Sequence, residues 1–229
     1  MFPVGDEPVR GGPPAVVTYG LIALNVLAFL IEFAQPSEGA LQSFIQAWGV
    51  VPREYSAARD LPPTIPLPFW STLFTSMFLH GGWMHLGGNM LYLWIFGDNL
   101  EKVMGAARFL VFYLVCGLAA SFAHIMFGAA SNVPAVGASG AISGVLAGYL
   151  LLFPHNRIRV LTRGGIAQVP ALIVVGLWIV IQFINGIGSI ATTSETGGGG
   201  VAYMAHIGGF IAGLVLVKLM TPARRPAMA

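Results

Sequence analysis

The sequence predicts an all-α membrane protein: a bundle of six transmembrane helices with a long first loop on the outer side. Of its 229 residues, 56% are hydrophobic and only 9% are charged, and the mean hydropathy is +0.78. Such a chain has too little polar surface to coat a soluble globule. Its apolar residues also gather in segments that can cross a bilayer as helices and are too long for barrel strands.

Six apolar segments of about membrane length follow one another along the chain. They cover residues 15–33, 83–100, 107–127, 139–153, 169–190 and 201–219. The fourth is short for a span, so we expect its neighbours to shield it from lipid. We expect residues 1–14 to form a short flexible cytoplasmic tail without a signal peptide. Residues 15–220 would form the six-helix domain, and residues 221–229 a short basic tail.

The distribution of positive charge favours one orientation in the membrane. Six spans place both termini and the second and fourth connections on the same side. Nine of the 11 Lys and Arg residues fall there, including Arg157, Arg159 and Arg163, whereas Arg53 and Arg59 lie in the first connection. The positive-inside rule therefore puts both termini in the cytoplasm, and we expect a prokaryotic plasma membrane.

Two connections on the expected outer side have distinctive compositions. The first, residues 35–79, is much longer than two helices need and contains a proline-rich stretch at 61–68. It also carries aromatic residues such as Trp48 and Trp70, so we expect an amphipathic structure lying in the membrane interface rather than a disordered loop. The last connection, residues 192–200, ends in four glycines and is either a flexible join or the hinge of a lid.

The stretch from Gly137 to Gly144 places a serine between glycines, where loop-like sequence changes to helix-like sequence. A hydroxyl at this point begins a helix at membrane depth, where polar groups are costly. Ser139 could serve the backbone as an N-cap, and the small residues around it could serve helix packing. Chemistry is the third possibility, and the other polar residues of the spans bear on it.

Polar residues from three spans are expected to share one depth. Spans two, four and six all run inward from the outer face, so their N-terminal ends lie at similar depths. Span two brings His80, His85 and Asn89 there, span four brings Ser139, and span six brings His206. Because polar side chains in a membrane face the bundle interior or a water-filled cavity, we expect a common cavity.

The spacing in span two suits an oxyanion site. His85 and Asn89 are four residues apart, so on a helix they share a face, and each offers an N–H donor. Paired donors stabilise the negative charge that develops on a carbonyl oxygen during acyl transfer. Interhelical hydrogen bonding is the alternative role for this pair, and a structural role is favoured for His80.

Stripes of small residues predict that spans four and six touch. The glycines of these stripes are spaced by four: Gly140, Gly144 and Gly148 in span four, and Gly209 and Gly213 in span six. Such surfaces allow close approach of two helix backbones. This contact would bring the serine of span four within reach of the histidine of span six, as a hydroxyl nucleophile beside a general base.

Other chemistries fit the sequence less well. A zinc protease would need two histidines four apart with a glutamate between them, whereas His80 and His85 are five apart and enclose no acid. A proton-coupled transporter usually places an acid or a base deep within a span, but the acids here cluster in loops and ends. The single cysteine, Cys116, excludes an internal disulfide framework and reads as a small buried residue.

Taken together, these residues resemble the motifs of the rhomboid family of intramembrane serine proteases. Gly137-Ala138-Ser139-Gly140 resembles its G-x-S-G motif, and the span-two histidines and asparagine resemble its H-x4-H-x3-N motif. Ala205-His206-Ile207-Gly208-Gly209 resembles its A-H-x-x-G motif, and Glu101 with Lys102 also fits. The resemblance covers residues 15–219, with three motifs in the right order and on the right spans.

The resemblance implies a Ser-His dyad without a third acid, in a cavity open to the outer side. Ser139 would be the nucleophile and His206 the general base, while His85, Asn89 and the Ser139 backbone N–H would hold the oxyanion. Supporting roles would fall to Gly137, Gly140, His80, Ser143 and Gly209. The resemblance implies neither a cofactor nor a metal. Its substrates are transmembrane segments cut near the outer interface, and the fifth span and residues 192–200 resemble the family's gate and lid.

Two positions depart from the family pattern. Many members carry an aromatic residue four positions after the nucleophile, against which the base stacks. This chain has Ser143 there, which could hydrogen-bond His206 instead. Some members carry a Trp-Arg pair in the first outer loop, where this chain has Trp48-Gly49.

Two other functions are compatible with this reading of the sequence. The chain could be a proteolytically inactive rhomboid-like protein that binds membrane clients, or, less favoured, a small-solute carrier. An inactive relative is expected to lack the serine or the histidine, and both are present. The expected partners are membrane lipid and transmembrane protein substrates, with no nucleic acid and no obligate protein partner.

Overall fold

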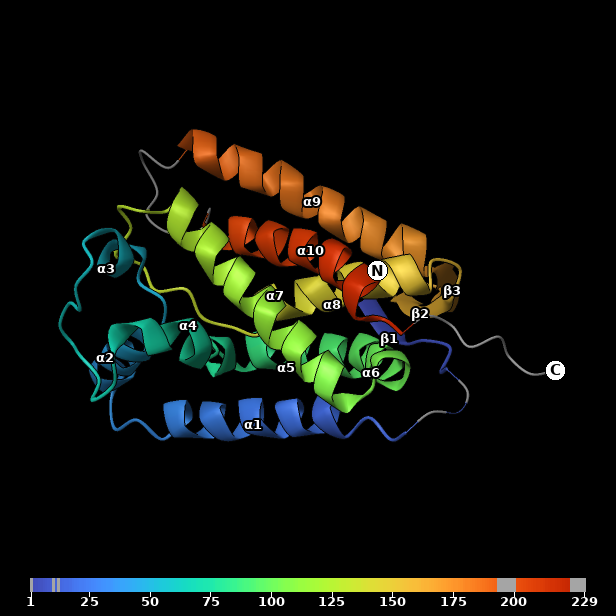
Figure 1. Ribbon diagram of the computed structural model, residues 1–229, viewed down its shortest axis with the longest axis horizontal. Coiled ribbons are helices and arrows are strands. Elements are labelled where there is room, and N and C mark those ends of the chain that lie inside the picture. Colours follow the sequence, from blue (N-terminus) through green and yellow to red (C-terminus); the bar gives the residue numbers. More distant parts are fainter. Residues whose placement is uncertain (1, 10, 12, 193–200, 223–229) are drawn as a thin grey trace.

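Helices dominate the fold. The computed structural model describes residues 2–9, 11, 13–192 and 201–222, and Figure 1 shows its long helices running back and forth between two ends of the molecule. They are α1 (Val16–Phe33), α5 (Trp83–Tyr92) continuing through the π-helical turn η3 (Leu93–Gly97) into α6 (Asp98–Met104), α7 (Ala106–Phe127), α8 (Ser139–Leu152), α9 (Ala171–Thr192) and α10 (Val201–Met220). The helical class predicted from the sequence is confirmed in this coarse sense.

Three helices in the described part of the chain are long and apolar enough to cross a membrane. They are α1, α7 and the Tyr203–Met220 portion of α10. Helix α8 and the Ala171–Gly186 portion of α9 are apolar but shorter. The expected second span is helical too, although η3 interrupts its regular α-helical hydrogen bonding. Six membrane crossings therefore remain a prediction.

The first loop folds into short helices at one end of the molecule, on the left in Figure 1. They are α2 (Glu38–Trp48), α3 (Pro52–Ser56), α4 (Thr72–Thr75) and the 3-10 turns η1 (Phe69–Ser71) and η2 (Ser76–Phe78). The Ser37 hydroxyl caps α2 by accepting from the Ala40 N–H at 3.2 Å. The end of α2 is tied to α4, since the Thr75 hydroxyl donates to the Trp48 carbonyl at 2.7 Å. This loop is folded, and its place in the membrane interface remains a prediction.

A small antiparallel sheet lies at the opposite end and corrects the all-α prediction. Its strands are β1 (Phe2–Gly5), β2 (Arg157–Thr162) and β3 (Gly165–Pro170), in the order β1-β2-β3. Ile158 and Val160 are fully buried while the arginines beside them point outward, the alternation of a half-buried strand. The alternation of arginines with Ile158 and Val160 is the sequence signal for this strand, which the charge-based interpretation of the arginines does not use.

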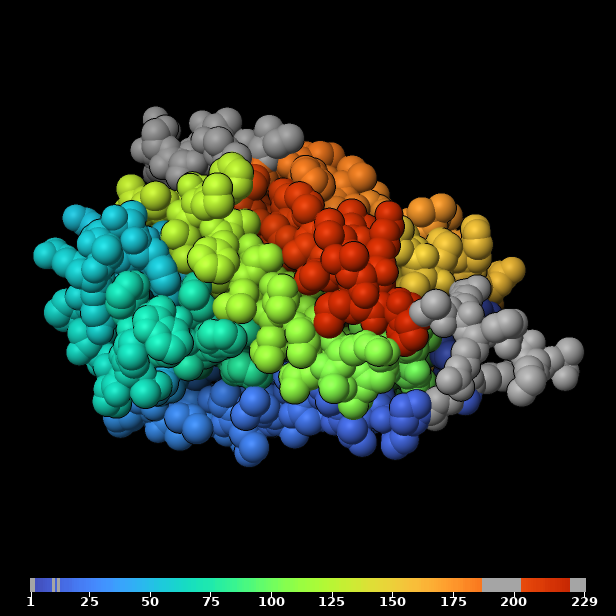
Figure 2. Space-filling model, viewed as in Figure 1, coloured from blue at the N-terminus to red at the C-terminus, as the bar shows by residue number. Residues whose placement is uncertain are grey.

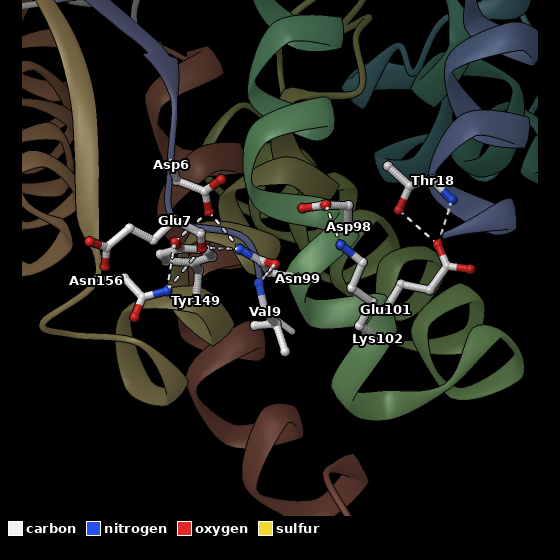
Figure 3. Close-up of polar contacts among 10 residues, drawn as sticks. All are labelled: Asp6, Glu7, Val9, Thr18, Asp98, Asn99, Glu101, Lys102, Tyr149 and Asn156. Carbon is white, nitrogen blue, oxygen red and sulfur yellow. Dashed lines mark hydrogen bonds and ion pairs between the residues drawn. The ribbon is translucent and has the colours of Figure 1, made fainter. Parts of the chain in front are cut away.

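The expected flexible tail also differs from the structure, because polar side chains hold residues 2–9 against the bundle (Figure 3). Asp6 accepts hydrogen bonds from the Asn99 amide at 2.6 Å and the Tyr149 hydroxyl at 2.5 Å. Asn99 in turn accepts the Val9 N–H at 2.7 Å. Strand pairing and these bonds offset the entropy lost on ordering a segment with almost no apolar core of its own.

Glu101 ties α6 to the first turn of α1. Its fully buried carboxylate accepts the Val17 N–H at 2.9 Å, the Thr18 N–H at 2.7 Å and the Thr18 hydroxyl at 2.8 Å. The first N–H groups of a helix have no intrahelical acceptor, and Ala15 supplies no side-chain cap for α1. A carboxylate from another helix therefore accepts hydrogen bonds from the N–H groups in the first turn of α1, as Figure 3 shows for Thr18.

The centre of the bundle is built from α7, α8 and α10. All residues of α8 from Gly140 to Tyr149 are buried, and α10 packs against both α8 and α7. Figure 2 shows α7 and α10 side by side on one face of the molecule, above α1. In Figure 1, α8 begins near the middle of the bundle, and the chain after α7 runs inward to reach it. Helix α8 therefore begins within the bundle, where its first residue, Ser139, is half-buried.

Candidate active site

Ser139 and His206 lie within hydrogen-bonding distance of each other. The Ser139 Oγ is 2.8 Å from the His206 Nε2. Ser139 is the first residue of α8, and His206 lies in the second turn of α10. Both side chains are half-buried. The predicted contact between these two helices is confirmed, and it places a hydroxyl beside an imidazole.

Glycines allow the close approach of α8 and α10. A Cβ added at Gly213 would lie 2.6 Å from the Gly144 Cα, and one at Gly209 would lie 2.9 Å from the Gly140 carbonyl carbon. Ordinary contacts between carbon atoms begin near about 3.5 Å. Only residues without side chains fit at these points, as the small-residue stripes predicted.

His85 and Asn89 approach the start of α8 from α5. A Cβ at Gly137 would lie 2.9 Å from the His85 Nε2 and 3.6 Å from the Asn89 Nδ2. Gly137 also has a φ of +123°, which favours glycine. The Gly81 N–H donates to the His85 Nδ1 at 3.3 Å. In a neutral ring, the hydrogen is then on Nε2, which lies beside Gly137.

The amide nitrogen of Asn89 is an unused donor. Asn89 is 8% exposed, and its buried Nδ2 has no hydrogen-bond partner among the described residues. Leaving a buried donor unpaired costs about 1–3 kcal/mol. Together with the His85 Nε2, it forms a pair of N–H donors on the side of Gly137, two residues before Ser139.

His80 is buried next to His85 and is held by several contacts. Its backbone N–H donates to both carboxylate oxygens of Glu32, at 2.9 and 3.1 Å. Its Nδ1 lies 3.3 Å from the Phe78 carbonyl oxygen, and its ring contacts the His85 ring edge-on at a centroid distance of 5.1 Å. His80 is 1% exposed and packs against His85, in keeping with the structural role favoured from the sequence.

A cavity of about 160 Å³ opens beside Ser139 and His206. Its walls include Ser121 and His124 of α7, together with residues 133–137 of the chain that leads into α8. A volume of this size holds several water molecules. His85 and Asn89 are not among the residues that line it, although both lie beside the lining residue Gly137. Of the residues expected to share a cavity, this one is lined by the serine and the histidine, together with Gly137, and the two donors of α5 are next to that glycine.

Ser143 does not hydrogen-bond His206, the alternative that the sequence left open. Its hydroxyl donates to the backbone carbonyl of Ser139 at 2.6 Å. The hydroxyl of a serine inside a helix commonly donates to the backbone carbonyl four residues earlier in the chain.

Helix α9 supplies the neighbours of His206 that we did not predict. The Gln182 Oε1 lies 2.7 Å from the His206 Nδ1, and the Trp178 ring lies 5.8 Å from the imidazole, tilted by 41°. Trp178 and Gln182 are four residues apart and so share a face of the helix. This pair of a polar and an aromatic residue, four apart in an apolar segment, was the sequence signal that could have indicated contacts of α9 with the site.

The proposed lid and the Trp48-Gly49 pair of the first loop are the two remaining features expected from the sequence. Residues 193–200, the core of the proposed lid, lie outside the described residues. Trp48 and Gly49 contact other segments: a Cβ at Gly49 would lie 2.9 Å from the Pro134 Cβ. The first loop therefore packs against the chain that leads into α8.

A comparison with protein families decides the relationship. The family model described as "Rhomboid domain" matches residues 68–223. The chain belongs to the rhomboid family. Members of this family are integral membrane proteins, and the apolar helices of the rhomboid chain agree with that. The match includes α5, α8 and α10, which carry the residues described above.

Several named rhomboid proteins are similar to the chain. "Rhomboid protein 1, mitochondrial" of Saccharomyces cerevisiae is 28% identical over 206 residues, which cover 88% of this chain and 52% of the yeast protein. "Rhomboid protease GluP" of Bacillus subtilis is 31% identical over 204 residues, covering 89% of this chain and 34% of that protein. This chain thus spans about half or less of the length of these relatives.

Proposed function

We propose that the chain is an intramembrane serine endopeptidase that hydrolyses peptide bonds in or near transmembrane segments of other proteins. The observation that carries the proposal is the 2.8 Å contact between the Ser139 Oγ and the His206 Nε2 beside a cavity. Membership of the rhomboid family supports it, as does the name of the related Bacillus protein.

The two side chains can divide the chemistry between them. As the Ser139 oxygen attacks the scissile carbonyl carbon, the His206 Nε2 takes the hydroxyl proton. The imidazolium then gives this proton to the departing amine, and an acyl-serine remains. Water from the cavity attacks the acyl group while His206 again accepts and returns a proton. The cycle ends with free Ser139 and the two peptide products.

Three donors can stabilise the oxyanion of each tetrahedral intermediate. The Ser139 backbone N–H is at the N-terminus of α8, where the first N–H groups lack intrahelical acceptors and the helix dipole favours negative charge. The Asn89 amide and the His85 Nε2–H lie beside Gly137, two residues before Ser139. A buried donor that waits for an acceptor is preorganised for this task.

A substrate has to present an extended strand to Ser139. The nucleophile lies inside the bundle at the start of α8, and a helical peptide bond is shielded by its own neighbours. Transmembrane segments with helix-destabilising residues are therefore the proposed substrates. The proposed setting is a six-span topology in a prokaryotic plasma membrane, with cytoplasmic termini and a site open to the outer side.

The test is cleavage in liposomes. Purified protein is mixed with a panel of membrane-anchored substrates, alongside Ser139→Ala and Ser43→Ala, which removes an exposed serine of α2. A fluorophosphonate probe is applied to the same samples. We expect cleavage and labelling for the wild type and Ser43→Ala, and neither for Ser139→Ala.

The rival functions predict different results. An inactive client-binding rhomboid would bind substrates without cutting them and would not take the probe. A carrier would show solute flux that survives Ser139→Ala. Cleavage that persists in Ser139→Ala would remove Ser139 as the nucleophile and refute the proposal.

A further inference from the structure

The two nitrogens of the His206 ring have partners on opposite sides. Nε2 lies 2.8 Å from the Ser139 Oγ, and Nδ1 lies 2.7 Å from the Gln182 Oε1. An amide oxygen can only accept a hydrogen bond. In the neutral ring, the Nδ1 therefore carries the hydrogen and donates it to Gln182. The lone pair of Nε2 then faces the serine hydroxyl.

The ring is also held by aromatic side chains. Trp178 lies one turn before Gln182 on α9, with its ring 5.8 Å from the imidazole. Tyr203 of α10 meets the imidazole edge-on, at 6.5 Å and 88°. One face of α9 thus supplies both a hydrogen-bond acceptor and an aromatic contact to the same imidazole.

Gln182 is an unusual residue for its position. It is 8% exposed in a helix whose sequence is otherwise almost wholly apolar. Burying an amide costs free energy unless it is hydrogen-bonded, and polar residues within spans usually serve a function. The bond to His206 satisfies the oxygen of this amide.

We propose that Gln182 is a positioning residue that fixes the tautomer and orientation of His206. The proposal rests on the function proposed above for Ser139 and His206. It assigns to α9 the task that a carboxylate performs in a Ser-His-Asp triad, with a neutral oxygen in place of the charge. Gln182 does not contact the reacting atoms, and it acts through the ring.

The tautomer decides whether the pair can react. With the hydrogen on Nδ1, Nε2 can accept the serine proton. With the hydrogen on Nε2, the ring has no lone pair facing the serine. In triads, loss of the residue that fixes the tautomer costs up to about 10,000-fold in kcat. A neutral acceptor gives less charge stabilisation to the imidazolium, so we expect a loss of about 100-fold here.

The experiment compares Gln182→Met, Gln182→Glu and the control Asn185→Leu. Methionine keeps the length and apolar fit of glutamine without its acceptor, whereas glutamate keeps an oxygen. Asn185 is an exposed amide on the same helix. Cleavage kinetics are measured in liposomes, and nitrogen-15 chemical shifts of the His206 ring report which nitrogen carries the hydrogen.

For Gln182→Met we expect kcat to fall about 100-fold with little change in KM, and the Nδ1–H signature to be lost. Gln182→Glu should keep that signature and cleave faster than Gln182→Met. Its acidic limb in the pH–rate profile should move to higher pH, because a carboxylate stabilises the imidazolium. Asn185→Leu should match the wild type in every readout.

Several results would overturn the proposal. One is a Gln182→Met protein with kcat within about twofold of the wild type, or with an unchanged ring signature. If that variant fails to fold, a Gln182→Glu protein with the wild-type pH profile would do the same. Failure of the proposed function would look different: the wild type would neither cleave nor take the fluorophosphonate probe, while the chemical shifts would still report the tautomer.

Discussion

Adding one methyl group at Gly209 should separate the serine from the histidine. In Gly209→Ala the new Cβ would meet the backbone of α8, 2.9 Å from the Gly140 carbonyl carbon and closer still to its oxygen. Carbonyl groups of a packed helix cannot turn aside, so restoring ordinary contact requires the helices to part by about 1 Å. The Ser139–His206 distance of 2.8 Å would then exceed hydrogen-bonding range. A displacement of this size costs about 100-fold in turnover.

The assay for Gly209→Ala is kcat for a membrane-anchored substrate in liposomes, with thermal unfolding measured on the same preparation. Gly176→Ala on α9 is the control, because a Cβ there meets nothing within 4 Å. We expect the control to cleave normally and Gly209→Ala to lose turnover while remaining folded. A folded Gly209→Ala protein with wild-type kcat would show that close contact between α8 and α10 does not set the geometry of the pair.

Two further variants test other parts of the structure. Asn89→Leu removes the unpaired buried donor, so kcat for the same substrate should fall about 100- to 1,000-fold with KM nearly unchanged; a loss confined to KM would contradict an oxyanion role. Burial is the main cause that raises the pKa of Asp6 from 3.8 to about 6, so the folded state binds this proton more tightly than the unfolded state. The contribution of Asp6 to the free energy of unfolding should therefore be present in full below about pH 4 and be lost as the pH rises through about 6. The melting temperature of Asp6→Asn, measured at pH 5 and pH 8, should depend less on pH than that of the wild type.

The sequence was most informative where short-range spacing has a direct geometric meaning. Glycines four apart predicted the contact of α8 with α10, and that contact brought Ser139 to His206. A spacing of four also placed His85 and Asn89 together on α5. These predictions needed only helical periodicity and the cost of placing polar groups in a membrane.

Contacts between distant segments could not be predicted in the same way. Gln182 meets His206 only because α9 packs against α10, and nothing in its own neighbourhood sets that register. Ser143 could have bonded His206, but it donates to the Ser139 carbonyl of its own helix. The strand β1 exists because β2 offers an edge more than 150 residues later in the sequence. Local propensity carries no information about such partners.

The position at which α8 begins sets the depth of the proposed reaction. The helix has 14 residues and so is about 21 Å long, against a hydrocarbon core of about 30 Å. If its far end meets the inner boundary, the hydroxyl of Ser139 lies about 9 Å below the outer one. A helical substrate covers that distance in about six residues. Its scissile bond would then sit nearly two turns inside its own apolar segment, so the proposed protease would select substrates by how easily those two turns unwind.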